Sequence, residues 1–343
     1  MLWIFHGIFM QEGRQAITSS GGDWNTLTRS EQWQQAWHHG PRELWEAVRI
    51  VSLPAFLLSL VFMGITLFLG ALRWQRLLHT QNIRLPYGRT LEISLVAHFF
   101  NSFLLGSTGG DLFKAYYAAR ETHHQKTEAV TTVLADRLIG LFSMLLFAAI
   151  MLLFNVGAWL DNPTLVSFGG LIAALFVGSA IFCYLAFFGG VSKRFPQVRE
   201  FLKRLPKAEV LERSLNSCRL FGENPRALLL ALVYSMVLNA VCVFQVYAVA
   251  GGLSLTVGLQ ALLFIVPAII CLSAIPITPS GLGVRENLFV LLLAAPQFAV
   301  PSTQALTLSL LTYAGSLIWS LIGGAVYLSF RDKHHLTETE SGP

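Results

Sequence analysis

The sequence predicts an all-α fold: a polytopic bundle of transmembrane helices with two broken, re-entrant helical hairpins and two halves arranged as an inverted repeat. Its 343 residues are 54% hydrophobic and only 13% charged, whereas soluble domains average about 25% charged residues. Several stretches long enough to cross about 30 Å of hydrocarbon carry no charge. Two further apolar stretches are interrupted by glycine or proline beside charged residues, which predicts interior breaks.

The net charge of +5 does not indicate nucleic-acid binding, because the basic residues collect in short loops. In a membrane protein this pattern reports orientation, since loops rich in Lys and Arg stay in the cytoplasm. The loops at 73–90 and 193–226 are of this kind, as is the tail at 331–343, so the C-terminus is expected in the cytoplasm. The turns without Lys or Arg are expected outside: 161–163, 251–256 and 296–303.

Residues 1–49 are expected to form an extracytoplasmic segment at the membrane interface. The apolar residues 1–10 are too few to cross the bilayer. They are either interfacial or the end of a first helix whose start is missing from this sequence. Trp24, Trp33, Trp37 and Trp45 follow, and Trp prefers the headgroup level. An amphipathic helix on the membrane surface fits around 30–48, and an ordinary loop fits there as well.

Residues 50–330 are expected to form the membrane domain. Arg73 and Trp74 end its first span and are expected to anchor that span at the interface. Asp136 and Arg137 are expected to open a later span. The predicted spans occupy residues 51–72, 138–160, most of 163–192, 227–250 and 305–330.

The first broken segment covers residues 91–120. Gly109 and Gly110 end the break, and Asp111 and Lys114 follow on the next helix. Both ends of the segment are expected on the cytoplasmic side. About 13 apolar residues precede the break, where a span needs about 20, so a re-entrant hairpin is favoured.

The second broken segment, residues 257–295, is interrupted between Pro276 and Glu286. Arg285 and Glu286 are the only formal charges between positions 227 and 330. A charge at the centre of a bilayer costs at least about 2.5–3.5 kcal/mol. Broken backbone at that depth survives only against protein or a water-filled cavity. The segment is therefore expected to hold an internal site, whether it is a hairpin or a pair of full crossings.

The order span, broken hairpin, span occurs twice, at 51–160 and at 227–330, with 163–192 as the link. The first copy starts outside and the second inside, which is the inverted-repeat plan of many secondary transporters. The two breaks also show a weak sequence similarity. The pair Gly109–Gly110 and the pair Gly281, Gly283 are each followed by one acidic and one basic residue.

A helix that begins after a glycine-rich break has unpaired N–H groups and a partial positive charge, which suits phosphate. The helices after Gly110 and Gly283 are expected to be of this kind. Arg285 adds a forked guanidinium that suits phosphate. Asp111 and Glu286 are expected to engage a cationic headgroup or to balance Arg285, Arg137 or Lys114.

Simpler roles remain open for several of these residues. The charges at Asp136, Arg137, Arg285 and Glu286 could only pin helices together, and Lys114 could extend to the interface. Asn101 could donate across a cleft or form an ordinary interhelical hydrogen bond. His98 is interpreted as a satisfied interior histidine.

The predicted binding residues share a position at or beside the two breaks, or in the following span. They are Asn101, Gly109, Gly110, Asp111, Lys114, Asp136, Arg137, Pro279, Gly281, Gly283, Arg285 and Glu286. No nucleophile–base arrangement, metal-ligand spacing or nucleotide loop is visible in the sequence. No catalytic residue, metal or cofactor is therefore expected.

Two stretches resemble signatures of a known family. Residues 101–116 are similar to N-x-x-L-P-x-x-x-G-G-D-x-x-R-A-Y, and residues 276–286 to P-x-x-P-x-G-L-G-x-R-E. Residues 71–74 and the pair Asp136–Arg137 are weaker blocks. Together they resemble the lysylphosphatidylglycerol synthase transmembrane family, a flippase-like membrane domain. Leu105 stands where the pattern has Pro, and Lys114 where it has Arg, which leaves headgroup specificity open.

The resemblance implies a plasma-membrane protein of bacterial type that moves a polar-headed lipid between leaflets. It also implies a further span before 51–72. In the family's best-known members a soluble aminoacyltransferase domain follows, whereas here only residues 331–343 follow the last span. Synthase activity is therefore not expected.

Three functions remain in view. The leading hypothesis is a translocator whose partner is a membrane phospholipid or lipid-linked substrate. The second is a membrane enzyme acting on a lipid or lipid carrier. The third is a non-transporting partner of a separately encoded lipid-modifying enzyme.

Overall fold

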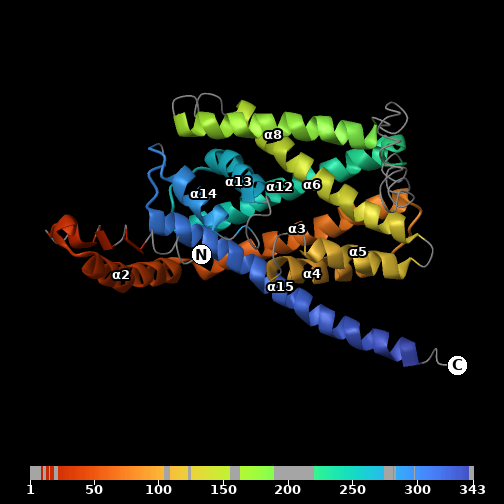
Figure 1. The fold of residues 1–343 in the computed structure, drawn as a ribbon, viewed down its shortest axis with the longest axis horizontal. Helices are drawn as coiled ribbons and strands as arrows, with labels where there is room; N and C mark the ends of the chain where they lie inside the picture. The colour runs from red at the N-terminus through yellow and green to blue at the C-terminus, as the bar shows by residue number, and fades with distance from the viewer. Residues whose placement is uncertain are drawn as a thin grey trace.

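The computed structural model describes residues 22–103, 109–122, 125–154, 163–188, 220–273, 281, 283–296 and 298–339, with a few residues (9–10, 13–14, 16–18) before them. All regular elements in these ranges are helices, which confirms the all-α prediction (Figure 1). They are the short 3-10 helix η1 (Trp24–Thr26), α2 (Arg29–Ile50), α3 (Leu53–Thr80), α4 (Tyr87–Phe103), α5 (Gly109–Glu121), α6 (Lys126–Phe154), α8 (Pro163–Phe187), α12 (Pro225–Gly252), α13 (Leu259–Ser273), α14 (Val284–Leu293) and α15 (Ser302–Thr339).

Among the described residues, five helices are long and apolar enough to cross a membrane: α3, α6, α8, α12 and α15. The expected start of the second span was wrong, because α6 begins at Lys126 and carries Asp136 and Arg137 within it. The residues before this pair are mostly Ala, Val, Leu and Thr. These residues therefore continue the helix. Asp136 and Arg137 can lie within it because they find partners inside the bundle, as described below.

Helices α4 and α5 form the first hairpin and lie side by side (Figure 1). They have 17 and 13 residues, or about 25 Å and 20 Å of helix at 1.5 Å per residue. Their approach is very close at Gly110, where a Cβ would lie 1.9 Å from the carbonyl oxygen of Ala97. Only glycine permits this contact.

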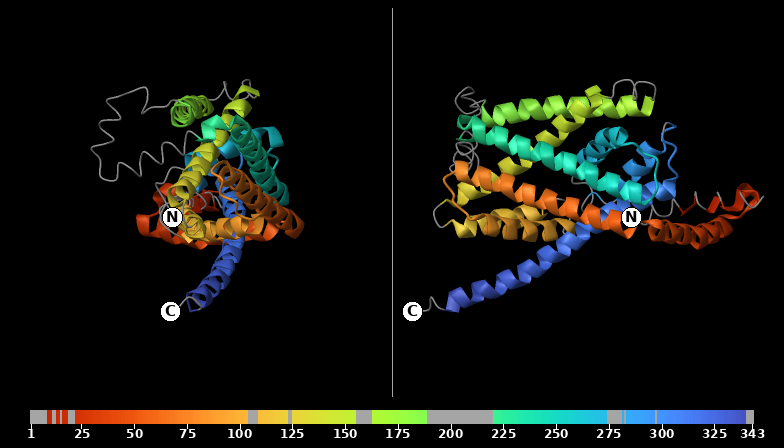
Figure 2. Two further views of the ribbon diagram at one scale, coloured as in Figure 1. Left: turned by 90° about the vertical axis from the view of Figure 1, so that its right-hand side faces the viewer. Right: turned by 180° about the vertical axis from the view of Figure 1, so that it is seen from behind.

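Helices α13 and α14 form the second hairpin, at the opposite end of the long axis from α4 and α5 (Figures 1 and 2). They have 15 and 10 residues, or about 22 Å and 15 Å, which is too short for two full crossings. Re-entry is therefore favoured here too. Gly281 (φ +68°) and Gly283 (φ +95°) supply left-handed turns at the break.

Helix packing supports the inverted repeat. Exchanging α2 with α8, α3 with α12, α4 with α13, α5 with α14 and α6 with α15 turns each closely packed pair into another closely packed pair. Thus α4 packs on α15 as α13 packs on α6, and α2 packs on α15 as α8 packs on α6. Helices α12 and α13 begin 172 residues after α3 and α4 (225 less 53, and 259 less 87). Helix α8 is therefore more than a link, because it corresponds to α2.

Helix α2 begins with a capping box in which the Glu31 carboxylate accepts the Thr28 backbone N–H at 2.8 Å. This hydrogen bond lowers the pKa of Glu31. Trp33, Trp37 and Trp45 are exposed, as expected of an amphipathic helix. In Figure 1 the helix projects past the end of the bundle, and its placement on a membrane surface stays a prediction.

Some sequence predictions lie outside the described residues. These are most of the apolar segment 1–10, Pro279, and most of the basic loop 193–226.

We predict that Gly110→Ala loosens the first hairpin. The added methyl group collides with backbone, which cannot move aside as a side chain can, so the loss of stability should reach about 3 kcal/mol. The thermal unfolding midpoint in detergent measures it.

Gly88→Ala is the matched control, because Gly88 lies on α4 and a methyl group added there would have nothing within 4 Å. It should leave the midpoint unchanged or slightly raised. Equal midpoints for the two variants would contradict the close packing at Gly110.

Candidate functional site

A cavity of about 350 Å³ lies between the two hairpins and the central spans. Most of its wall is apolar, but several polar and two charged side chains reach it, and we call it the polar cavity. Asn101, near the end of α4, and Ser273, at the end of α13, both reach it, so both broken elements contribute to one chamber. Its polar lining residues are His98, Asn101, Ser102, Arg137, Cys242, Gln245, Ser273, Arg285, Thr312, Tyr313 and Ser316.

Corresponding positions of the two halves line the cavity. At an offset of 172 residues, His98 and Asn101 of α4 correspond to Ile270 and Ser273 of α13, and all four line the cavity. Polar chemistry is thus concentrated where the halves face each other, as in transporters built from inverted repeats.

Arg285 reaches the cavity from the first turn of α14. It forms an ion pair with Glu286, its Nε donates to the Ser309 hydroxyl at 3.2 Å, and its guanidinium lies 4.4 Å from the centre of the Tyr313 ring. Two elements therefore hold the guanidinium in place while its side chain stays 15% exposed. Cation–π contact of this kind suits the planar, weakly hydrated Arg head.

Glu286 is 1% exposed and is not part of the cavity wall. Its Oε2 accepts the Gly283 N–H at 2.5 Å, and its Oε1 accepts from Arg285 and from the Ser309 hydroxyl. The carboxylate thus closes the start of α14 and orients Arg285.

A second buried charge cluster joins α3, α5 and α6. The Asp136 carboxylate accepts from Arg73 Nε at 2.7 Å and from Lys114 Nζ at 2.8 Å. Arg73 also donates to the Ser235 hydroxyl of α12 at 2.9 Å, and Lys114 lies 4.3 Å from the centre of the Trp74 ring. Each oxygen of Asp136 therefore has its own cation.

The predicted interfacial anchor at Arg73 and Trp74 was wrong. Trp74 is fully buried and its Nε1 donates to the Thr132 hydroxyl at 3.1 Å, while the Arg73 side chain is only 13% exposed. Lys114 is likewise buried rather than extended to the interface. A basic residue at the end of an apolar span looks the same in sequence whether it faces water or a buried carboxylate.

Arg137 connects this cluster with the cavity. It follows Asp136 on α6, lines the cavity, and lies 3.5 Å from the carboxylate of Asp111 at the start of α5. Its side chain is 33% exposed, which makes it the more accessible of the two cavity guanidiniums.

The backbone N–H groups at the two helix starts were expected to bind phosphate, and the structure changes this expectation. Asn101 Oδ1 accepts the Gly110 N–H at 2.8 Å, so Asn101 caps α5, and the Gly283 N–H is bonded to Glu286. These two donors are already used within the protein. The guanidiniums of Arg137 and Arg285 are the better anion ligands.

Of the predicted residues, Asn101, Arg137 and Arg285 line the cavity. Behind it, the carboxylates of Asp111, Asp136 and Glu286 hold cations in place, and Lys114 is one of the two cations that Asp136 holds. Gly109, Gly110, Gly281 and Gly283 shape the two breaks.

His98 is hydrogen-bonded inside the bundle, as the sequence interpretation had it, but it also lines the cavity, which that interpretation did not include. Its Nε2 lies 3.2 Å from the Ser316 carbonyl oxygen and 3.3 Å from the Ser316 hydroxyl. A single histidine in an apolar stretch carries no sequence signal for such a position.

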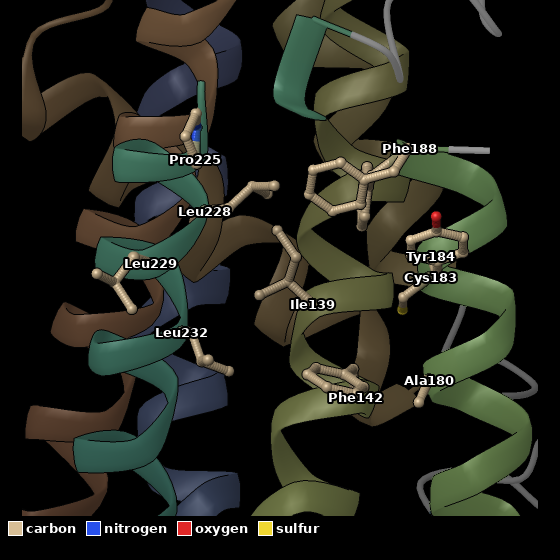
Figure 3. Close-up of a pocket in the computed structure, with 11 residues that line it drawn as sticks. Ile139, Phe142, Ala180, Cys183, Tyr184, Phe188, Pro225, Leu228, Leu229 and Leu232 are labelled. Atoms are coloured by element: carbon tan, nitrogen blue, oxygen red, sulfur yellow. The ribbon is translucent and has the colours of Figure 1, made fainter. Parts of the chain in front are cut away.

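A second cavity, of about 360 Å³, lies between α6, α8 and α12 (Figure 3). Its lining is apolar apart from the Tyr184 hydroxyl and the Cys183 thiol. Ile139 and Phe142 face it from α6, opposite to the face that carries Arg137 and Met144 into the polar cavity. It offers nothing to a polar headgroup. Within the part of the chain that the structure describes, no group of three His, Cys, Asp or Glu could hold a metal ion.

Residues 32–324 match the family model described as the lysylphosphatidylglycerol synthase TM region. The chain is 24% identical over 300 residues to a UPF0104 membrane protein of Pyrococcus horikoshii. This match covers 80% of this chain and 87% of the relative. It is also 24% identical over 270 residues to a UPF0104 membrane protein of Methanothermobacter thermautotrophicus, covering 73% and 78%.

We predict that Asp136→Asn destabilises the protein by about 3–5 kcal/mol, because it leaves Arg73 and Lys114 buried without a carboxylate. The thermal midpoint of the purified protein should fall accordingly.

Glu92→Gln is the matched control. Glu92 pairs with Arg89 at 2.9 Å but is 42% exposed, so its loss should cost no more than about 1 kcal/mol. If Asp136→Asn were as mild as this control, the ion pairs would not hold α3, α5 and α6 together.

Proposed function

The chain belongs to the lysylphosphatidylglycerol synthase TM region family, and from this premise we propose that it moves a phospholipid between the leaflets of the plasma membrane. It is a multi-pass membrane protein, and the described part of the chain has five helices suited to spanning. The lipid phosphate would enter the polar cavity, and the acyl chains would stay in the surrounding hydrocarbon.

One observation carries the proposal: two guanidiniums from different halves of the chain, Arg137 and Arg285, line one cavity inside a membrane domain. Charged groups at this depth are rare and usually mark a substrate pathway. Arg suits a phosphate oxygen pair because its fork donates two parallel hydrogen bonds. Asp111 and Glu286 orient the two guanidiniums, and Asn101 fixes the hairpin beside them.

The hairpins support passage through the bilayer rather than binding at one face. The α4–α5 hairpin and the α13–α14 hairpin enter from opposite ends of the bundle (Figure 2) and meet at the cavity. Basic residues in 73–90 and after Phe330 favour the cytoplasm for the first hairpin and for the C-terminus. The second hairpin would then open outward.

One contact favours a second candidate, a lipid-modifying enzyme. The Ser316 hydroxyl lies 3.3 Å from His98 Nε2, which is the spacing of a nucleophile and its base. However, the same nitrogen lies nearer the Ser316 carbonyl oxygen, which can only accept a hydrogen bond. An Nε2–H donated to this carbonyl would occupy the position at which a base must accept the hydroxyl proton, which favours translocation.

We predict that Arg285→Lys lowers the rate of phospholipid movement at least tenfold in reconstituted vesicles. Lysine keeps a positive charge beside buried Glu286, so the variant should fold, but it loses the fork and the stacking on Tyr313. Loss of labelled phosphatidylglycerol from the inner leaflet, followed with a membrane-impermeant quencher, measures the rate.

Arg285→Ala combined with Glu286→Gln removes both charges and should abolish movement without leaving a lone buried carboxylate. Arg76→Ala, at an exposed position on α3, should have no effect. Normal rates in both Arg285 variants would contradict the proposal, and recovery of chemically altered lipid would favour the enzyme instead.

A further inference from the structure

His98 occupies the polar cavity together with two permanent cations. It lies on α4, while Arg137 comes from α6 and Arg285 from α14. The remaining titratable groups in the described lining are Cys242 of α12 and Tyr313 of α15, and no carboxylate is among the described lining residues. The carboxylates of Asp111 and Glu286 lie behind the guanidiniums with which they pair.

The hydrogen bonds of the imidazole limit where a proton can be added. The Ser316 carbonyl oxygen at 3.2 Å can only accept, and on this contact we assign the proton of the neutral ring to Nε2. A second proton would go to Nδ1 and convert it from an acceptor to a donor. The ring can therefore gain a charge without breaking its contact with α15.

The surrounding charges decide when this happens. In the empty cavity, the imidazole faces no carboxylate among the described lining residues and lies apart from bulk water, which disfavours a positive charge. A phosphate bound to the two arginines reverses the sign of the nearest charge and favours the imidazolium. Asn101 and Ser102 follow His98 by three and four residues, on the same face of α4. Asn101 is held by its bond to Gly110, which fixes this face relative to the cavity.

We propose that His98 takes up a proton when a phosphate headgroup binds in the cavity, so that the protein binds its lipid together with a proton. This inference rests on the proposed function, because it requires a phosphate between Arg137 and Arg285. It adds that His98 contributes to headgroup binding and links affinity to pH.

The first test counts protons. Binding of dihexanoyl phosphatidylglycerol and of dihexanoyl phosphatidylethanolamine to the full-length protein in detergent is measured by calorimetry at pH 7.5. Several buffers of different ionisation enthalpy are used. Both probes are phosphodiesters, and their phosphate groups do not titrate near pH 7.5. The wild type should take up close to one proton per lipid bound, and His98→Gln close to none.

His79→Gln is the matched control, since His79 is exposed on α3 and outside the cavity. It should take up as many protons as the wild type. Equal uptake by His98→Gln and the wild type would overturn the assignment to His98.

The second test needs no variant. The dissociation constant of the wild type should rise with pH, approaching tenfold per unit where His98 is neutral in the free protein and charged in the loaded one, and it should level off at the pH where the loaded histidine loses its proton. A flat profile between pH 6 and pH 9 would overturn the proposal for His98 and leave the phosphate site intact. If neither lipid bound at any pH, the proposed function would fail, and the role of His98 would fail with it.

Discussion

The structure depends on the neutralisation of charges that lie inside hydrocarbon. The clearest case is Asp136, whose two oxygens accept separately from Arg73 and Lys114. These ion pairs connect a span, a re-entrant helix and a second span, so the first hairpin is fixed by charge as well as by close packing at Gly110. A buried carboxylate that lost one of its cations would be strongly destabilising. The cluster therefore fixes the arrangement of α3, α5 and α6.

The second half has the same helix arrangement but a different interior. By position within their helices, Gln245 corresponds to Arg73 and Thr312 to Asp136. In place of the ion pair, Gln245 Nε2 donates to the Thr312 carbonyl oxygen at 3.4 Å, and both residues line the cavity. A long neutral hydrogen bond contributes far less than a buried ion pair. Ion pairs thus hold the helices together in the first half. The corresponding helices of the second half lack these pairs, and the cavity lies between them.

Much of the fold could be predicted because hydrocarbon constrains sequence strongly. Uncharged stretches identified the spans, and glycine-rich breaks identified both hairpins. The pairs Arg137–Asp111 and Arg285–Glu286 were among the pairings expected. The partners of Arg73 and Asp136 could not be predicted, because pairing depends on which helix faces meet. For that reason Arg73 looked like an interfacial anchor and Asp136 like the start of a helix. His98 was recognised only as an interior histidine, since its place in the cavity depends on residues from α6, α14 and α15. Asn101 and Glu286 were recognised as polar residues near the breaks, but not as the caps of α5 and α14.

The balance of charge around the cavity follows from these pairings. Four cations, Arg73, Lys114, Arg137 and Arg285, face three carboxylates, Asp111, Asp136 and Glu286. One positive charge is left over, and since Asp136 is shared by Arg73 and Lys114 deep in the bundle, the accessible cations are those of the cavity. A single phosphodiester carries one negative charge, which this excess would balance. The N–H groups of Gly110 and Gly283 are already bonded within the protein. The phosphate would therefore be bound by side chains, which the two hairpins position. A site of this kind binds the phosphate common to many lipids and leaves discrimination between headgroups to the neutral part of the cavity wall.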